Sequence, residues 1–234
     1  MTGRHNDYQR EYYSTRSVPR MTADLVRTPY VQRHVTEVLS DLAVPEGAKV
    51  LDLGCGPGKY TIALAERGID VEGLDLTPAL VEMLRASAPE IPVHVADAAE
   101  LPGELRGRFD AVTGFFFLHH LPALAPTLAS ARAALRPGGR AVFLEPNPLY
   151  VGYYFQIAFT PGMTWRGERG IVHMTVRNLH RSARSAGFDN FEERVFGAVP
   201  PPIANRVWGR RLEGVLESVP GWDRIGAFRL ITLW

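Results

Sequence analysis

The feature that most constrains the fold of this chain is a glycine-rich turn that follows a short apolar run. Residues 50–53 (VLDL) have the pattern of a buried strand and lead directly into residues 54–58 (GCGPG), and residues 60–67 carry apolar side chains at helical spacing. A glycine-rich connection from strand to helix lets the backbone approach a ligand closely and directs amide groups toward it. The sequence therefore predicts a strand-helix-strand unit with a ligand site at the end of its first strand.

Strand-like and helix-like segments alternate along the rest of the chain. The predicted strands are residues 50–53, 71–74, 93–95, 111–117, 140–144, 191–196 and 227–233, and the predicted helices are residues 30–42, 60–67, 80–86, 124–135 and 176–185. Because strands alternate with helices and parallel crossovers are right-handed, we expect an α/β fold with a doubly wound, Rossmann-like sheet. Ligands of such sheets bind at the carboxyl ends of the strands.

The length of 234 residues suits one domain spanning residues 1–234. Within it, we expect residues 1–35 to form a helical leader that acts as a lid, and residues 36–147 to form the cofactor-binding core. Residues 148–175 interrupt the alternation with an aromatic stretch after the fifth strand, which indicates an insertion over the acceptor site. Residues 176–234 are expected to complete the sheet.

Composition excludes several classes of protein. Hydrophobic residues make up 46% of the chain and charged residues 22%, so a sizeable core can form, and the net charge of +1 gives no bias toward nucleic acid. The single cysteine, Cys55, excludes an intrachain disulfide and a multi-cysteine zinc site. No signal peptide and no apolar run long enough to cross a membrane is visible. We therefore expect a cytoplasmic protein without a membrane partner; the sequence predicts no oligomeric state.

The turn and the acids that follow it favour a particular class of cofactor. The glycines stand at positions 54, 56 and 58, and Lys59 occupies the sixth position, which departs from the dinucleotide pattern G-x-G-x-x-G. Asp75 ends the second strand about 20 residues beyond the turn, where a carboxylate can accept hydrogen bonds from ribose hydroxyls. Asp97 ends the third strand. A site this poor in fixed positive charge suits a sulfonium cofactor better than a pyrophosphate.

Five segments, in order and suitably spaced, resemble the Rossmann-like (class I) S-adenosylmethionine-dependent methyltransferases. They are residues 50–58 (VLDLGCGPG), 73–75 (GLD), 95–98 (VADA), 109–112 (FDAV) and 135–139 (LRPGG). The resemblance implies a sheet of about seven strands whose last strand is antiparallel. For S-adenosylmethionine it implies Gly54, Gly56 and Gly58 around the methionine moiety and Asp52 near its ammonium group. It also implies Asp75 at the ribose, and Asp97 with Ala98 at the adenine.

Other residues are expected to complete the cofactor site. They are Cys55, Leu76, Phe115, Phe116 and Tyr13. Cys55 has no neighbouring base in the sequence, so we expect it to pack in the turn rather than to act as a nucleophile. For an isolated motif, tight packing of the helix on the sheet would explain the glycines equally well, and a helix cap would explain Asp75.

Candidate catalytic residues follow the fourth and fifth strands. His119 and His120 come after the fourth strand, where this fold places them beside the reactive end of the cofactor, and histidine titrates near neutral pH. Glu145 ends the fifth strand and is expected to face the same cleft. A general base is optional in methyl transfer, because holding the two reactants in line supplies much of the rate. The alternative is structural: the histidines shape the loop, and Glu145 holds the backbone of the insertion.

Aromatic side chains gather in the leader and in the insertion. We expect these segments to form an apolar lid over the acceptor, although an ordinary satellite core would have the same composition. The predicted substrate-binding residues are Tyr12, Asn147, Tyr150, Tyr153, Tyr154 and Trp165.

The function that best fits these patterns is transfer of a methyl group to an oxygen, nitrogen or carbon atom of a small-molecule acceptor, in a biosynthetic pathway. The alternatives are methylation of RNA or protein, and a catalytically silent cofactor-binding scaffold; an NAD-linked oxidoreductase is disfavoured by the sixth-position Lys59. The balanced charge argues against nucleic acid as a partner. No metal is expected, because the sequence has neither a His-Glu-x-x-His motif nor a cysteine pair.

Overall fold

The computed structural model of the chain describes Asp7 and residues 21–160 and 163–234. The predicted ligand contacts Tyr12 and Tyr13 lie outside the described residues.

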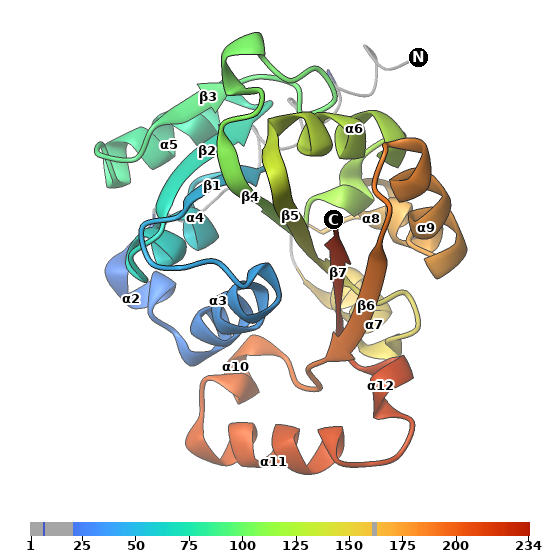
Figure 1. The fold of residues 1–234 in the computed structure, drawn as a ribbon. Helices are drawn as coiled ribbons and strands as arrows, with labels where there is room; N and C mark the ends of the chain where they lie inside the picture. Colours follow the sequence, from blue (N-terminus) through green and yellow to red (C-terminus); the bar gives the residue numbers. More distant parts are fainter. Residues whose placement is uncertain (1–6, 8–20, 161–162) are drawn as a thin grey trace.

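A seven-stranded sheet runs through the centre of the protein in the order β3-β2-β1-β4-β5-β7-β6 (Figure 1). The strands are β1 (Lys49–Leu53), β2 (Asp70–Asp75), β3 (Val93–Val95), β4 (Phe109–Phe115), β5 (Leu135–Pro146), β6 (Phe191–Phe196) and β7 (Phe228–Leu233). Strands β1 to β5 pair in parallel, and β7 is antiparallel to both β5 and β6. This confirms the predicted doubly wound sheet with an antiparallel last strand. The strand order reverses between β1 and β4, the position where such sheets bind ligands.

Helices cover both faces of the sheet. One face packs against α2 (Ala23–Val26), α3 (Pro29–Leu42), α4 (Lys59–Ala65) and α5 (Pro78–Ser87), and the other against α6 (Leu124–Ala134) and α9 (Val176–Ser185). In α3 the buried residues Val31, Val35, Val38 and Leu42 recur every three or four positions, so one stripe of the helix faces the sheet. The helix begins with a proline, which is favoured in the first turn, and ends at Ala43 in the left-handed conformation.

The insertion after β5 is helical. It comprises α7 (Val151–Phe159), α8 (Trp165–Glu168) and the 3-10 helix η3 (Arg169–His173), and two further 3-10 helices, η1 (Gly103–Leu105) and η2 (Leu118–His120), lie on either side of β4 in the chain. Tyr153, Ile157 and Ile171 form a small apolar cluster of their own within the insertion. None of the helices in the described part of the chain combines the length and the apolar character needed to cross a bilayer.

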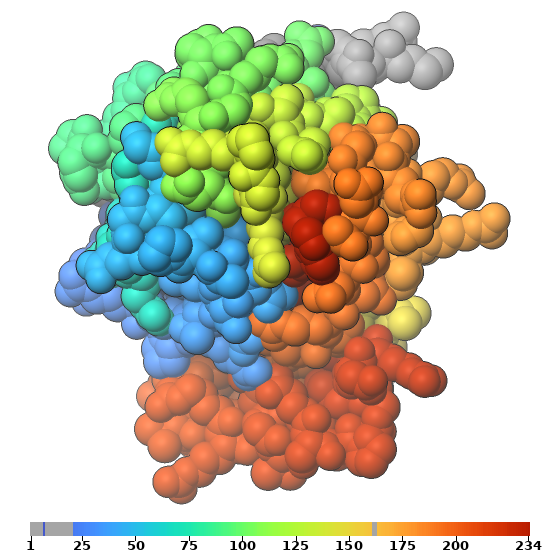
Figure 2. Space-filling view, in the orientation of Figure 1, coloured from blue at the N-terminus to red at the C-terminus, as the bar shows by residue number. Residues whose placement is uncertain are grey.

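Three helices between β6 and β7 were not predicted from the sequence. They are α10 (Pro201–Ala204), α11 (Val207–Glu217) and α12 (Trp222–Ile225), and they form a band along one edge of the molecule (Figure 2). Two glycines, Gly209 and Gly214, lower the helix propensity of α11, and only Gly209 and Glu213 of this helix are buried. The local sequence signal for this segment is therefore weak.

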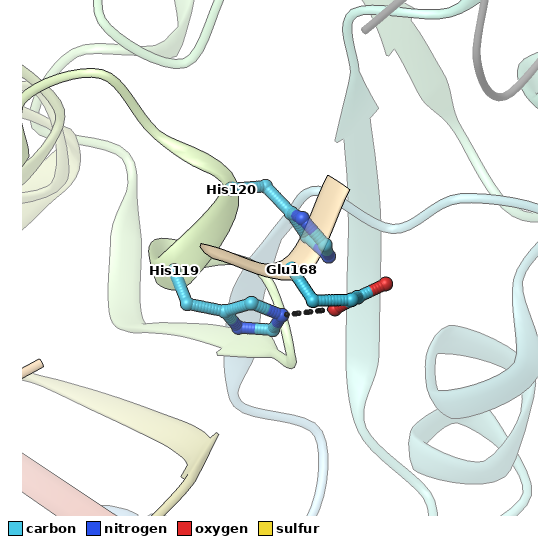
Figure 3. A group of neighbouring side chains, drawn as sticks. All are labelled: His119, His120 and Glu168. Atoms are coloured by element: carbon cyan, nitrogen blue, oxygen red, sulfur yellow. Dashed lines mark hydrogen bonds and ion pairs between the residues drawn. The ribbon is translucent and has the colours of Figure 1, made fainter. Parts of the chain in front are cut away.

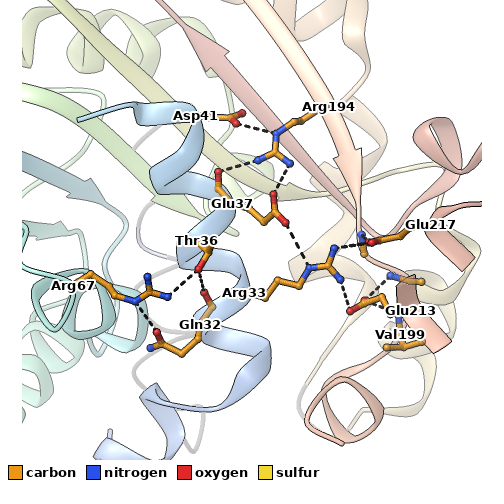
Figure 4. A network of polar contacts seen from close by, with 12 residues as sticks. Gln32, Arg33, Thr36, Glu37, Asp41, Arg67, Arg194, Val199, Glu213 and Glu217 are labelled. Atoms are coloured by element: carbon orange, nitrogen blue, oxygen red, sulfur yellow. Dashed lines mark hydrogen bonds and ion pairs between the residues drawn. The ribbon is translucent and has the colours of Figure 1, made fainter. Parts of the chain in front are cut away.

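Ion pairs to α3 attach the C-terminal segment to the domain (Figure 4). Arg33 pairs with Glu213 and, over 2.7 Å, with Glu217, both on α11. Arg194 on β6 pairs with Glu37 over 2.6 Å and with Asp41 over 2.9 Å. Since α3 also covers the central strands, this network links the last third of the chain to the core.

Candidate functional site

A cavity of about 610 Å³ opens at the carboxyl ends of β1, β2 and β4. Its described walls include most of the residues predicted to bind the cofactor, and two of those predicted to be catalytic. They are Asp52, Gly54, Cys55, Gly56, Asp75, Leu76, Asp97, Ala98, Phe115, Phe116, His119 and His120. Its size lies within the range typical of small-molecule sites.

The glycine-rich turn has the backbone geometry that only glycine adopts readily. Gly54, Gly56 and Gly58 have φ values of +71°, +53° and +94°. A side chain at Gly54 would collide with the ring of Phe117, whereas Gly56 faces open space. Gly58 precedes α4 and packs against Leu84, and the described walls of the cavity do not include it. The structure thus shows close packing at Gly58, and its contact with the ligand stays a prediction.

Asp52 presents an unsatisfied oxygen at the floor of the cavity. Its Oδ2 accepts a hydrogen bond from Thr61 Oγ1 over 2.7 Å, and its buried Oδ1 has no partner among the described residues. Burial, together with the neighbouring Asp75, raises the pKa of Asp52 to about 7. A buried carboxylate without a counter-charge is costly, so this position fits a cationic group of a ligand.

Two other charged side chains line the same part of the cavity. Asp75 accepts hydrogen bonds from the backbone amides of Gly56 and Thr77, and burial raises its pKa. The Nζ atom of Lys59 lies 4.5 Å from the centre of the Tyr60 ring, and burial lowers the pKa of this amine to about 8. The cavity therefore offers acceptors for hydroxyl groups and one amine that suits a carboxylate.

The side chains of Cys55 and Asp97 have mainly local contacts. Cys55 is buried, and burial raises the pKa of its thiol, which favours packing over nucleophilic attack. Oδ1 of Asp97 accepts a hydrogen bond from the amide of Ala99 over 2.8 Å.

Phe115 stacks on Tyr60 with ring centres 4.2 Å apart, which supports the floor of the cavity.

Glu145 is buried at the end of β5 and holds the loop after β4. Its Oε1 accepts hydrogen bonds from the amides of Phe117 and Leu118 over 2.8 and 2.6 Å, and its Oε2 lies 2.6 Å from Nδ1 of His119. It is 0% exposed and is not part of the described cavity wall. In the described structure Glu145 reaches the cavity through His119, and its direct contact with a substrate stays a prediction.

His119 lies between two carboxylates. Its Nε2 is 3.3 Å from Oε2 of Glu168, a residue of α8 in the insertion. Burial opposes protonation of this ring, but Glu145 and Glu168 outweigh burial and raise the pKa of His119 to about 9. For Glu168, burial alone would raise the pKa of the carboxyl group, but its contacts with His119, His120 and Tyr153 lower that pKa to about 2. A ring that holds its proton at neutral pH is a poor general base.

His120 and Glu168 complete a compact cluster with His119 (Figure 3). Nδ1 of His120 donates a hydrogen bond to the carbonyl of Gly167 over 3.2 Å, and the Tyr153 hydroxyl donates one to Oε2 of Glu168 over 2.9 Å. One ring nitrogen of each histidine and one carboxylate oxygen of Glu168 lie within 4.8 Å of one another. All three side chains line the cavity.

Of the described residues predicted to bind the substrate, only Tyr153 lines the cavity. Asn147 is buried and donates to the carbonyls of Arg224 and Gly226, and the hydroxyls of Tyr150 and Tyr154 donate to the carbonyls of Ala198 and Pro148. The polar ends of these side chains thus satisfy the backbone of the insertion and of the C-terminal segment, and their contact with a substrate stays a prediction. Trp165 is 52% exposed and is likewise not part of the described wall.

Sequence reasoning missed Glu168. Neither a strand end nor a known motif marks this glutamate, and it meets His119 because η3 packs closely on η2. Gly170 makes that approach possible, since a side chain there would collide with the carbonyl of His119. The sequence signal that was available is the glycine-flanked stretch itself, residues 165–170 (WRGERG).

Comparison with known proteins identifies the family. Residues 27–193 match the family described as "Methyltransferase domain". The chain is 35% identical over 200 residues to the ubiquinone biosynthesis O-methyltransferase of Xanthomonas oryzae pv. oryzae, a match that covers 84% of this chain and 71% of that protein. A protein of the same name from Alkalilimnicola ehrlichii is 35% identical over 116 residues, covering 48% of this chain. That match covers 47% of the relative, about half of its length.

Solved structures share the fold. The S-adenosylmethionine-dependent methyltransferase from Mesorhizobium loti superimposes with a TM-score of 0.60 and 23% identity, covering 89% of this chain and 99% of that chain. The family match extends over more than half of the chain and includes the glycine turn, the strand-end acids and the two histidines. The chain therefore belongs to the methyltransferase domain family, in its Rossmann-like, S-adenosylmethionine-dependent class.

Proposed function

We propose that this chain transfers a methyl group from S-adenosylmethionine to an oxygen atom of a small-molecule acceptor in a biosynthetic pathway. The observation that carries the proposal is the division of one cavity into two chemically different ends. All of these residues line the cavity, and we assign the cofactor to the end with Asp52, Asp75 and the glycine turn, and the acceptor to the end with His119, His120 and Glu168. The named function of the curated relatives supports oxygen as the atom that is methylated.

The first end of the cavity fits S-adenosylmethionine. The unsatisfied Oδ1 of Asp52 would receive the ammonium group, Asp75 the ribose hydroxyls, and Lys59 the carboxylate. Asp97 and Ala98 would lie beside the adenine. The bound cofactor supplies an electrophilic methyl group on a sulfonium.

The second end would hold the acceptor. Its walls are apolar where Leu121 and Met163 lie, and polar at the histidine and glutamate cluster. The acceptor oxygen would form a bond to the methyl carbon as the carbon-sulfur bond breaks, and the hydroxyl proton would pass to His120, because His119 already holds its proton. In-line placement of the two reactants would supply much of the rate. The acceptor class that fits is a hydroxylated, largely apolar small molecule.

Calorimetric titration and a labelled-methyl assay test this function. The protein is expected to bind S-adenosylmethionine with a micromolar dissociation constant and to transfer labelled methyl to hydroxylated aromatic compounds or to an acceptor in a small-molecule extract. Binding without transfer to any acceptor would mean that the chain is a silent scaffold. Transfer to RNA or protein, with salt-dependent polynucleotide binding in a filter assay, would replace the small-molecule proposal.

A further inference from the structure

The geometry points to a binding site for a divalent transition-metal ion formed by His119, His120 and Glu168, at the acceptor end of the cavity (Figure 3). Two imidazoles and one carboxylate converge from η2 and α8, and the cavity lies in front of them. Two histidines with one carboxylate, and positions left open for other ligands, form a recurrent catalytic site for zinc and for iron(II). The nitrogen-rich set disfavours Mg²⁺ and Ca²⁺, which prefer oxygen ligands.

Hydrogen bonds at the far side of both imidazoles orient their ligand atoms. Nδ1 of His119 lies 2.6 Å from Glu145, and Nδ1 of His120 donates to the carbonyl of Gly167, so Nε2 is the ring nitrogen directed to coordination in both. The Tyr153 hydroxyl holds Oε2 of Glu168. Metal-binding histidines characteristically donate their second ring nitrogen to a carboxylate or a backbone carbonyl, as both do here.

The spacing of the ligand atoms suits an ion. Nε2 of His119 and Oε2 of Glu168 are 3.3 Å apart. Two ligands about 2.1 Å from a tetrahedral ion stand about 3.4 Å apart, so these two side chains need almost no rearrangement to share one. The His119 and His120 ring centres are 3.9 Å apart, which allows both rings to face the same point.

The charges of the cluster also match a divalent ion. Glu145 and Glu168 are 0% and 3% exposed, so two carboxylates are buried within hydrogen-bond distance of one imidazole. Buried carboxylates require compensating positive charge. One imidazolium compensates half of this charge, whereas a divalent ion held by two neutral imidazoles compensates all of it.

The ion would act on the acceptor, and this part of the inference rests on the proposed function. A hydroxyl group that coordinates the ion becomes more acidic and is held at a defined position, where its oxygen can attack the methyl carbon. Metal binding itself does not depend on the identity of the acceptor, so the two proposals can fail separately.

Binding of Co²⁺ alone tests the site. Tag-free protein is dialysed against a chelator and titrated with Co²⁺, with the visible absorption spectrum and the metal content after dialysis as readouts. We expect one Co²⁺ per chain with a micromolar dissociation constant and a spectrum of four- or five-coordinate geometry. His120→Ala and Glu168→Gln should each weaken binding at least 10-fold. Circular dichroism checks that both variants fold.

A histidine elsewhere provides the matched control. His94 pairs with Glu72 over 2.9 Å near the far edge of the sheet, so His94→Ala should bind Co²⁺ as the unchanged protein does. The site would be refuted by the absence of stoichiometric binding to the unchanged protein, or by undiminished binding in folded His120→Ala and Glu168→Gln. Co²⁺ binding without methyl transfer would retain the site and reject the proposed function. Methyl transfer that persists in the chelator-treated protein would retain the proposed function and reject the action of the ion on the acceptor.

Discussion

Oδ2 of Asp75 accepts a hydrogen bond from the backbone amide of Gly56 over 2.9 Å, so the acid at the end of β2 holds the glycine turn at the end of β1. The other oxygen of the same carboxylate accepts from the amide of Thr77 over 2.8 Å. One side chain therefore sets the shape of the turn and, in the proposed function, receives the ribose. The two roles are compatible, because each carboxylate oxygen can accept more than one hydrogen bond.

Replacement of this carboxylate should weaken cofactor binding. Asp75→Asn retains one acceptor oxygen and loses the charge, so the dissociation constant for S-adenosylmethionine should rise about 10- to 100-fold, the value of one or two hydrogen bonds to a charged group. Isothermal titration calorimetry measures it. Asp70→Asn, at the exposed start of the same strand, is the control and should leave the constant unchanged. Equal affinity in both variants would remove Asp75 from the site.

Cofactor affinity should increase with pH around neutrality. The pKa of Asp52 is about 7 in the folded protein, above the ordinary value, so its protonated form contributes stability that is present at low pH and is lost as the pH rises through 7. An ammonium group prefers the ionised form. Between pH 6 and 7.5, affinity should therefore rise roughly eightfold, the change in the ionised fraction. Calorimetry of Asp52→Asn should show a flat profile, and a slope that persists there would assign the effect to another group.

Loss of the Glu145 charge should destabilise the fold. Glu145→Gln leaves His119 with one carboxylate and weakens two hydrogen bonds from loop amides, so the free energy of unfolding should fall by about 3 kcal/mol, as is typical when a buried ion pair loses one partner. Urea denaturation followed by tryptophan fluorescence measures this change. Glu192→Gln, exposed on β6, should stay within about 0.5 kcal/mol of the unchanged protein. If the two variants had equal stability, the structural role given to Glu145 would be wrong.

Two glycines should respond oppositely to the same substitution. Gly170→Ala places a methyl group against the carbonyl of His119 and should lower the free energy of unfolding by about 1 to 3 kcal/mol. Gly214→Ala adds a methyl group in open space within α11 and should raise it by about 0.5 to 1 kcal/mol, because alanine is the better helix former. Thermal or urea unfolding of the two variants measures both changes in the free energy of unfolding. A neutral Gly170→Ala would show that η3 can move away from η2.

Much of the fold could be predicted because its signals are local. The helix over residues 176–185 and the strand over residues 191–196 have the predicted bounds, and in the helix Val176, Leu179 and Ala183 recur at helical spacing. The α11 helix could not be predicted, because its glycines weaken the local signal and its stability depends on Glu213 and Glu217 meeting Arg33. Ion pairs between distant residues have no signature in a window of sequence.

The candidate site divides in the same way. The sequence by itself determined the doubly wound sheet, the turn at residues 54–58 and the acids that follow it, because strand ends and glycine turns are properties of short segments. Only the tertiary structure decided that Glu168 joins His119 and His120, and that Asn147, Tyr150 and Tyr154 serve the backbone instead of the cavity. The physical reason is that the position of the insertion depends on tertiary contacts, which no local pattern in the sequence encodes. Its packing on the loop after β4 places one carboxylate beside two imidazoles.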